Sequence, residues 1–428
     1  MSSWFKTLIV RKRDGGVIDD GEWRRFVGAL VAGELPDYQV SAFLMAIYFR
    51  GMTTAETAAL TEAMASSGEQ LSLGVGPYVD KHSTGGVGDK VTLAAVPWAA
   101  ACGARVAKLS GRGLGFTGGT VDKLEAIPGF NCSLSAERLK ELADAVGCAI
   151  AEARAIAPAD KIIYALRDAT ATVEALPLIV SSILSKKIAG GAPAFVFDVK
   201  AGRGAFARDE RRARDLARAL VAAAKAAGRR GVAVLTAMDQ PLGRAVGNAL
   251  EVAEAAATLR GEGPGDVLEV SEAVAAEMLV SAGVAGPEEA RTRLARALEA
   301  GDAYAKLDEM ARAQGAPREW RERLPRAAKS ADVLAEDGGY VSLLDASAVA
   351  RAANALGAGR AAKEDEIDPA AGVVLHKKAG DAVSPGDVLM TLHYDDDRRL
   401  AEALRYARAA AELGDRPAPR PAVLDVLR

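Results

Sequence analysis

The chain has 428 residues, of which 50% are hydrophobic and 26% charged, and its formal net charge is -3. This composition is typical of a folded protein with two or three domains. The near balance of charges and the 5% aromatic content exclude the basic, aromatic-rich surface that nucleic-acid binding requires. The longest apolar run, residues 91–104, is interrupted by proline and glycine and is too short to cross a bilayer. We therefore expect no nucleic-acid partner, no membrane segment and a cytoplasmic location.

The first part of the chain is predicted to be helical. Val40, Phe43, Leu44 and Ile47 recur at helical spacing, and the pattern stops at Gly51. The following "TTAE", residues 53–56, has the form of a capping box at the start of a second helix. We assign residues 1–70 to the first part of a small helical domain.

After residue 70 the pattern changes to short apolar runs that end in glycine-rich loops and lead into alanine-rich helices. This alternation is typical of an α/β domain. We assign residues 71–157 and 193–335 to a larger α/β domain with a mixed sheet. The intervening residues 158–192 are helix-rich and are predicted to return to the helical domain. Residues 209–230 are expected to form an amphipathic helix that precedes a buried strand.

Residues 336–428 are predicted to form a C-terminal α+β domain of short strands and turns. The stretch "GVVLHKKAGDAVSPGDVLMTLHYDDD", residues 372–397, resembles the hammerhead unit of biotinyl and lipoyl carriers. It lacks the Ala-Met-Lys-Met turn of those carriers, so we expect a structural role. Cys102, Cys132 and Cys148 form no CxxC pair and are predicted to be free thiols.

Two glycine-rich loops suit an anion: "DKHSTGGVGDKVTLA" at residues 80–94 and "AKLSGRGLGFTGGT" at 107–120. Glycine lets backbone N–H groups approach a ligand, and a following helix adds the positive end of its dipole. One such loop is weak support because tight turns also use glycine, but two that converge favour phosphate. The chain has no GxxxxGK[ST], and "GVGDKV" in the first loop does not complete GxGxxG, so a single small phosphate is favoured over a dinucleotide. The flanking cations and hydroxyls are Lys81, Ser83, Thr84, Thr92, Lys108, Ser110, Arg112, Thr117 and Thr120.

The motifs at residues 80–93, 107–130, 164–187 and 238–255 together resemble the thymidine and pyrimidine-nucleoside phosphorylases over most of the chain. The resemblance implies that inorganic phosphate cleaves uridine, thymidine and deoxyuridine to the free base and a (2-deoxy-)α-D-ribose 1-phosphate. It also implies a homodimer, with phosphate as co-substrate and no other organic cofactor. An anthranilate-type phosphoribosyltransferase, which needs magnesium and a pyrophosphate site, and a nucleoside-binding protein without activity are the alternatives.

The resemblance also implies roles for individual residues. Phosphate would be bound by Lys81, Ser83, Thr92, Lys108, Ser110 and Thr120. The pyrimidine would be bound by Arg167, Ser182 and Lys186, with Tyr164, Val173, Ile179 and Phe206 as an apolar wall, although core packing is the alternative for each of these four. His82 titrates near neutrality and could protonate the pyrimidine O2 as the base departs. The alternative for His82 is a hydrogen bond within its loop.

Three features of the sequence bear on specificity and cofactors. Relatives that accept both uridine and thymidine have lysine at the position of Lys108, so a broad enzyme is expected rather than a strict thymidine phosphorylase. Phe116 stands where relatives usually have the histidine of "GLGHTGG", which removes a polar contact. Some relatives hold a monovalent cation such as potassium, and the matching residues are Gly88, Lys90, Leu242, Ala245 and Glu254. The Lys90 ammonium could itself pair with Glu254 in place of the ion.

Overall fold

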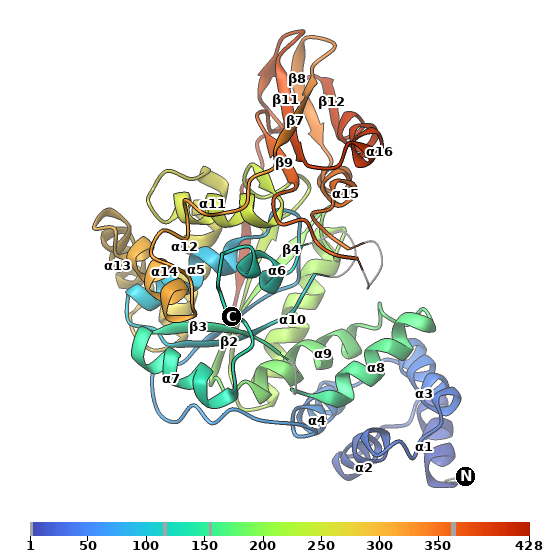
Figure 1. Cartoon of the computed structure of the whole chain (residues 1–428). Coiled ribbons are helices and arrows are strands. Elements are labelled where there is room, and N and C mark those ends of the chain that lie inside the picture. The colour runs from blue at the N-terminus through green and yellow to red at the C-terminus, as the bar shows by residue number, and fades with distance from the viewer. Residues whose placement is uncertain (1–2, 114–117, 154–155, 361–364) are drawn as a thin grey trace.

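The computed structural model describes residues 3–113, 118–153, 156–360 and 365–428. Figure 1 shows a helical part, a central α/β part and a C-terminal part built from short strands and helices. The predicted fold class, including a mixed central sheet, is confirmed. The N-terminus lies at the outer end of the helical part, whereas the C-terminus lies at the central sheet (Figure 1). Within the described residues, no helix is long and apolar enough to cross a membrane.

The helical part is built from two segments of the chain. Its helices are α1 (Ser3–Arg13), α2 (Asp20–Val31), α3 (Asp37–Arg50), α4 (Thr54–Ala65), α8 (Pro158–Ala169) and α9 (Leu176–Ala189). The four predicted apolar positions of α3 are buried, and Thr53 and Glu56 form the predicted capping box of α4. Ile163 of α8 and Leu178 of α9 belong to the same apolar core as α1–α4. The later part of α9, including Leu184, packs in the core of the α/β part, so α9 joins the two cores.

The central sheet has the strand order β1-β4-β5-β13. Its strands are β1 (Asp80–Ser83), β4 (Ala194–Ala201), β5 (Arg230–Ala237) and β13 (Val423–Leu427), and only β13 is antiparallel to its neighbour. A parallel pair, β2 (Val106–Ser110) and β3 (Cys148–Glu152), continues beside β1 through a bridge between Tyr78 and Arg105. The surrounding helices are α5 (Val91–Ala101), α6 (Thr120–Glu125), α7 (Ala136–Val146), α10 (Glu210–Ala226), α11 (Asn248–Thr258), α12 (Gly265–Ser281), α13 (Pro287–Glu299) and α14 (Asp302–Ala313). The amphipathic helix predicted at 209–230 is α10, which packs on β4 and β5.

The C-terminal part contains two antiparallel sheets, with strand orders β10-β8-β12 and β6-β9-β11-β7. The elements are β6 (Ala245–Val246), β7 (Lys329–Leu334), β8 (Gly339–Leu344), α15 (Ala346–Leu356), β9 (Gly372–Leu375), β10 (Ala382–Val383), β11 (Val388–Tyr394), α16 (Asp397–Arg408) and β12 (Ala411–Gly414). Figure 1 shows this part projecting from the α/β part, with α15 and α16 on one side of its sheets.

Three strands lie outside the parts in which the sequence boundaries place them. β6 and β7 were expected in the α/β domain but pair with β9 and β11 of the C-terminal sheets, and β13 was expected in the C-terminal domain but pairs with β5. Strand pairing uses backbone groups that are the same in every residue, so a short apolar strand carries little information about its partner. The return of β13 to the central sheet ties the end of the chain to the α/β part.

Candidate active site

The first predicted phosphate loop follows β1 at the carboxyl end of the central sheet. The register pairs His82 with Phe197 and Ser83 with Asp198, so the end of β1 lies beside the end of β4. In parallel sheets, ligands bind outside this carboxyl edge. The Lys81 side chain is fully buried, and its Nζ donates a 3.3 Å hydrogen bond to Thr92 Oγ1 in the first turn of α5. The structure therefore brings Lys81, Ser83 and Thr92 to the same edge.

Buried carboxylates surround these residues. Lys81 Nζ lies 3.1 Å from Asp198 Oδ2, which also lies 2.9 Å from Lys200 Nζ. The Ser83 hydroxyl donates to the Asp89 carboxylate and accepts a 3.1 Å bond from the Gly85 N–H. Burial alone would raise the pKa of Asp89, but Lys200, Lys81 and Lys123 hold this pKa far below its usual range. Asp89 is therefore ionised throughout the physiological range.

The second predicted loop is linked to the first by lysine contacts. Lys108 Nζ donates a 2.5 Å hydrogen bond to the Lys81 carbonyl, and Lys123 Nζ of α6 donates a 2.8 Å bond to the Asp89 carbonyl. Ser110 ends β2, and Thr120 begins α6, so both lie at the ends of this loop. Phe116 and Thr117 lie outside the described residues.

Arg112 does not present a free guanidinium to the second loop. It forms ion pairs with Asp122 at 3.4 Å, with Glu125 at 2.6 Å and with Glu152 at 3.0 Å. Asp122 also accepts a 2.6 Å hydrogen bond from the Gly113 N–H. These contacts give Arg112 a role in holding the loop in place. The sequence alone did not distinguish this role from phosphate binding.

The electrostatic environment of His82 is strongly positive. Burial lowers the pKa of its imidazole well below 6.5, and Lys187, Lys108, Lys81 and Lys186 lower it further. His82 is consequently neutral at pH 7 in the protein without substrates. A neutral imidazole still carries one N–H donor, and an anion bound among the lysines would raise its pKa again.

The predicted base-binding residues lie on α8 and α9. Lys186 Nζ contacts the Ser182 hydroxyl at 3.4 Å, as their spacing of one helical turn predicts, and forms an ion pair with the buried Asp160. Arg167 is 1% exposed. It donates to the carbonyls of Thr172 at 3.3 Å, of Leu178 at 3.1 Å and of Val173. Arg167 therefore also fixes the turn between α8 and α9.

The predicted apolar wall is divided between two parts of the chain. Tyr164 lies on α8, is 37% exposed and has the Arg167 guanidinium 5.9 Å from its ring centroid. Ile179 lies on α9 and packs partly buried against the α/β core. Phe206 is 48% exposed in the segment after β4. Val173 accepts a hydrogen bond from Arg167 through its backbone carbonyl, so Val173 contributes its backbone to this site.

The residues matched to a cation site in some relatives hold an ammonium group here. Lys90 Nζ donates to the carbonyls of Leu242 and Ala245, each at 2.9 Å, and to the Glu254 carboxylate. The Gly88 carbonyl accepts a 2.9 Å bond from the Lys90 backbone N–H. The same oxygens would have to bind a potassium ion, so this set of residues does not fit one.

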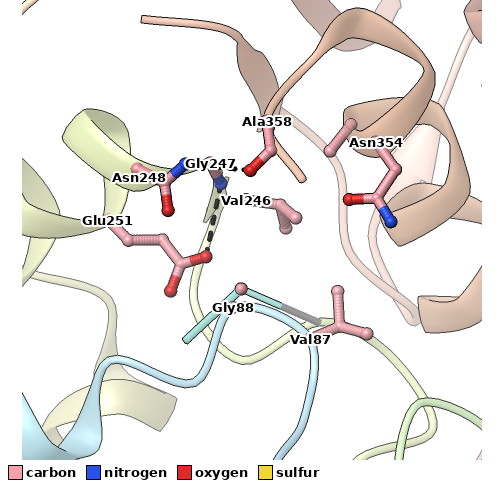
Figure 2. A pocket seen from close by; sticks show the side chains of 10 residues that line it. Val87, Gly88, Val246, Gly247, Asn248, Glu251, Asn354 and Ala358 are labelled. Carbon is pink, nitrogen blue, oxygen red and sulfur yellow. Dashed lines mark hydrogen bonds between the residues drawn. The ribbon is translucent and has the colours of Figure 1, made fainter. Parts of the chain in front are cut away.

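A small cavity lies behind the first loop, between the α/β and C-terminal parts. Figure 2 shows Val87 and Gly88 on one side of it and Asn354 and Ala358 on the other, with Glu251 pointing toward the backbone of Gly247. Glu251 accepts a 3.3 Å hydrogen bond from the Gly247 N–H and forms a 2.7 Å ion pair with Lys123. The cavity volume of about 10 Å³ suits at most one water molecule. It is therefore not a nucleoside site.

Several site residues were missed from the sequence: Asp80, Asp160, Lys187, Asp198 and Lys200. Lys187 Nζ lies 2.8 Å from Asp80 Oδ2 and donates to the Leu109 carbonyl at 3.1 Å, which joins α9 to β1 and β2. The alternation Asp198-Val199-Lys200 near the end of the apolar segment that forms β4 was a usable signal, because residues two apart in a strand share a face. Asp160 offered none, because an acidic residue in the first turn of a helix is common.

Family models match successive parts of this architecture. The helical bundle domain of the glycosyl transferase family matches residues 6–68, its a/b domain matches 75–304, and the pyrimidine nucleoside phosphorylase C-terminal domain matches 340–414. The fold and the site thus define a glycosyl transferase with a helical bundle and an a/b domain.

Two curated relatives identify the family within this class. The pyrimidine-nucleoside phosphorylase of Geobacillus stearothermophilus is 47% identical over 393 residues, covering 90% of this chain and 91% of that protein. The enzyme of the same name from Bacillus subtilis (strain 168) is 46% identical over 415 residues, covering 95% and 96%. The chain belongs to the pyrimidine-nucleoside phosphorylase family.

A solved structure shows a likeness of fold alone. Anthranilate phosphoribosyltransferase from Thermus thermophilus superposes with a TM-score of 0.60 at 23% sequence identity. The match covers 72% of this chain and 98% of that one. The shared fold explains why the sequence left this class of transferase as an alternative.

Proposed function

We propose that this protein catalyses phosphorolysis of pyrimidine nucleosides, in which inorganic phosphate displaces the base from C1′. The observation that carries the proposal is the position of His82, whose imidazole is influenced both by Lys81 and Lys108 of the phosphate loops and by Lys186 of α9. In this proposal, one titratable group would act on both the bound anion and the bound base. Membership of the pyrimidine-nucleoside phosphorylase family supports the same assignment.

The proposed reaction forms a bond from a phosphate oxygen to C1′ and breaks the bond from C1′ to N1 of the pyrimidine. Phosphate would be held by Lys81, Lys108, Ser83, Thr92, Ser110 and Thr120. Within the described residues, the ion pairs of this buried network join four lysines to three carboxylates: Lys81, Lys108, Lys187 and Lys200 to Asp80, Asp89 and Asp198. These groups include one more cation than anions while Lys108 is protonated. The excess charge favours a bound anion and orients the nucleophile without further reorganisation.

The electron pair of the broken bond passes to the departing base, and Arg167, Ser182 and Lys186 would bind its polar edge. Cations beside a base that becomes anionic stabilise the transition state more than the ground state. His82 would donate its N–H to the pyrimidine O2. Bound phosphate raises the pKa of His82, so the imidazole becomes a better proton donor only after the nucleophile has bound.

Three finer features belong to this proposal. Lys108 favours a broad pyrimidine-nucleoside phosphorylase that accepts ribosides and deoxyribosides. The exposed aromatic side chains of Tyr38, Tyr48 and Phe49 on α3 support a homodimer, which light scattering would check. The unpaired cysteines accord with a cytoplasmic location, which stays a prediction.

The assignment is tested by incubating the protein with uridine, thymidine or deoxyuridine, with and without phosphate, and measuring the free base. We expect base release only with phosphate, and with no requirement for a divalent metal. Release that needs magnesium and consumes or forms pyrophosphate would favour the phosphoribosyltransferase alternative. A protein that binds the nucleosides without releasing base would be the inactive alternative.

A further inference from the structure

Backbone carbonyls in the loop of residues 241–245 accept hydrogen bonds from two lysine ammonium groups. Lys90, at the start of α5, reaches the loop from the first phosphate loop. Lys378, between β9 and β10, reaches it from the C-terminal part and donates to the carbonyls of Pro241 at 2.6 Å and Gly243 at 2.9 Å. Carbonyl oxygens along this short loop are therefore already bound to cations that the chain itself provides.

Each N–H group of the Lys90 ammonium has a hydrogen-bond acceptor. A lysine ammonium has three N–H donors, and here they meet three acceptors: the carbonyls of Leu242 and Ala245 and the Glu254 carboxylate. The Lys90 side chain is fully buried. Glu254 is held in turn by the N–H groups of Arg244 at 3.0 Å and Ala245 at 3.1 Å. An ammonium with oxygen partners on all its protons has the role of a coordinated metal ion.

Two glycines beside the Lys90 ammonium adopt backbone conformations that keep the space around it free of side chains. Gly243 has a φ of +72°, and a Cβ there would lie 2.2 Å from Glu254 Oε2 and 2.9 Å from Lys90 Nζ. Gly88 has a φ of +69°, and a Cβ there would lie 2.5 Å from the Leu242 carbonyl oxygen. A metal ion added beside this ammonium would have to share its oxygens and would be repelled by its charge. The arrangement thus has room for one cation, and the chain fills it.

We propose that the Lys90 ammonium is a covalently attached substitute for a monovalent metal ion, so that this protein folds and works without potassium. The ammonium links the first phosphate loop, through Gly88 and Lys90, to the 241–245 loop and to Glu254 of α11. It also cannot dissociate, so the geometry of the first loop is independent of the salt in solution. The proposal concerns a structural cation and does not depend on the substrate assigned above.

The test compares thermal unfolding of the full chain and of a Lys90→Thr variant in potassium chloride and in tetramethylammonium chloride at equal ionic strength. Threonine removes the ammonium and leaves the carbonyls of Leu242 and Ala245 and the Glu254 carboxylate for an ion. A ligand that binds only the folded state raises Tm with its concentration. We expect the unaltered protein to have the same Tm in both salts, and the variant to lose several degrees in tetramethylammonium and to regain them in potassium.

A matched control is Lys12→Thr. Lys12 forms a buried 2.7 Å ion pair with Glu56 in the helical part, far from the 241–245 loop. This variant should lose stability by a similar amount but gain nothing from potassium. A potassium-specific rise of Tm in the unaltered protein would overturn the proposal, even if Lys90→Thr could not be purified. A loss of Tm in Lys90→Thr that potassium does not restore would also overturn it, because the ammonium would then be an ordinary ion-pair partner.

Discussion

The two halves of the candidate active site hold their cations in different ways. At the phosphate end, lysines at strand ends are balanced by carboxylates of the same buried network, as Lys81 is by Asp198. At the base end, Arg167 is held by backbone carbonyls of its own turn, and Lys186 is held by the single carboxylate of Asp160. The phosphate end is therefore rigid through many shared contacts, whereas the base end depends on one ion pair. Substitutions should accordingly have more local effects at the base end.

His82 is the group that belongs to both halves, so its loss should have the largest effect. We expect His82→Ala to lower kcat by about 10²–10⁴-fold, because that is the usual contribution of a general acid. The fold should be retained, since His82 is only partly buried at the end of β1. Steady-state kinetics with uridine and circular dichroism would measure both effects.

The role of His82 as proton donor would be contradicted by an unchanged kcat in His82→Ala, and the phosphorylase assignment would survive that result. His82→Asn provides a comparison, because asparagine can donate a hydrogen bond but no proton. If the imidazole acts only through a hydrogen bond, His82→Asn should recover most of the rate.

The single ion pair at the base end predicts the next largest effect. Asp160 is buried beside Lys186, and Asp160→Asn would leave that ammonium without its charge partner. We expect kcat/KM for the nucleoside to fall by up to about 100-fold through misplacement of Lys186, while KM for phosphate stays the same. Asp160→Glu should recover part of the loss.

The control for Asp160 is Asp168→Asn, which removes an exposed carboxylate from the same helix. It should leave both kinetic constants unchanged. An equal rise of KM for phosphate and for the nucleoside in Asp160→Asn would indicate a general loss of structure. The base end and the phosphate end of the site would then not respond independently to substitution.

The sequence predicted the fold and the cationic side of the site but not its anionic side. Lys81, Lys108 and Lys186 stand in motifs that can be quoted, whereas Asp198 and Asp160 come close to them only through the register of β1 with β4 and the packing of α8 on α9. Charge balance in a buried network is a property of the folded chain, because it depends on which strand ends are neighbours. For the same reason the partners of β7 and β13 could not be read from the sequence.

The smallest predicted effect concerns the rigid phosphate end and its pH dependence. Burial, with Lys187 and Lys81 nearby, lowers the pKa of Lys108 to about 7 despite the opposing effect of Asp80. A bound phosphate dianion favours the ammonium form and so raises this pKa. The affinity calculated from the concentration of the phosphate dianion at each pH should therefore be full below pH 7. It should fall as the pH rises toward the higher pKa of the complex, by about tenfold if one charge is lost.

Calorimetric titration of phosphate from pH 6 to 9 would measure this effect, with proton uptake on binding above pH 7 as its signature. Lys108→Arg is the matched variant, because a guanidinium stays protonated over this range. Its phosphate affinity should lack the decline that Lys108 produces, whereas the Asp160→Asn variant should keep it. The same decline in Lys108→Arg would assign the titration to another group, such as His82, whose lowered pKa bound phosphate would also raise.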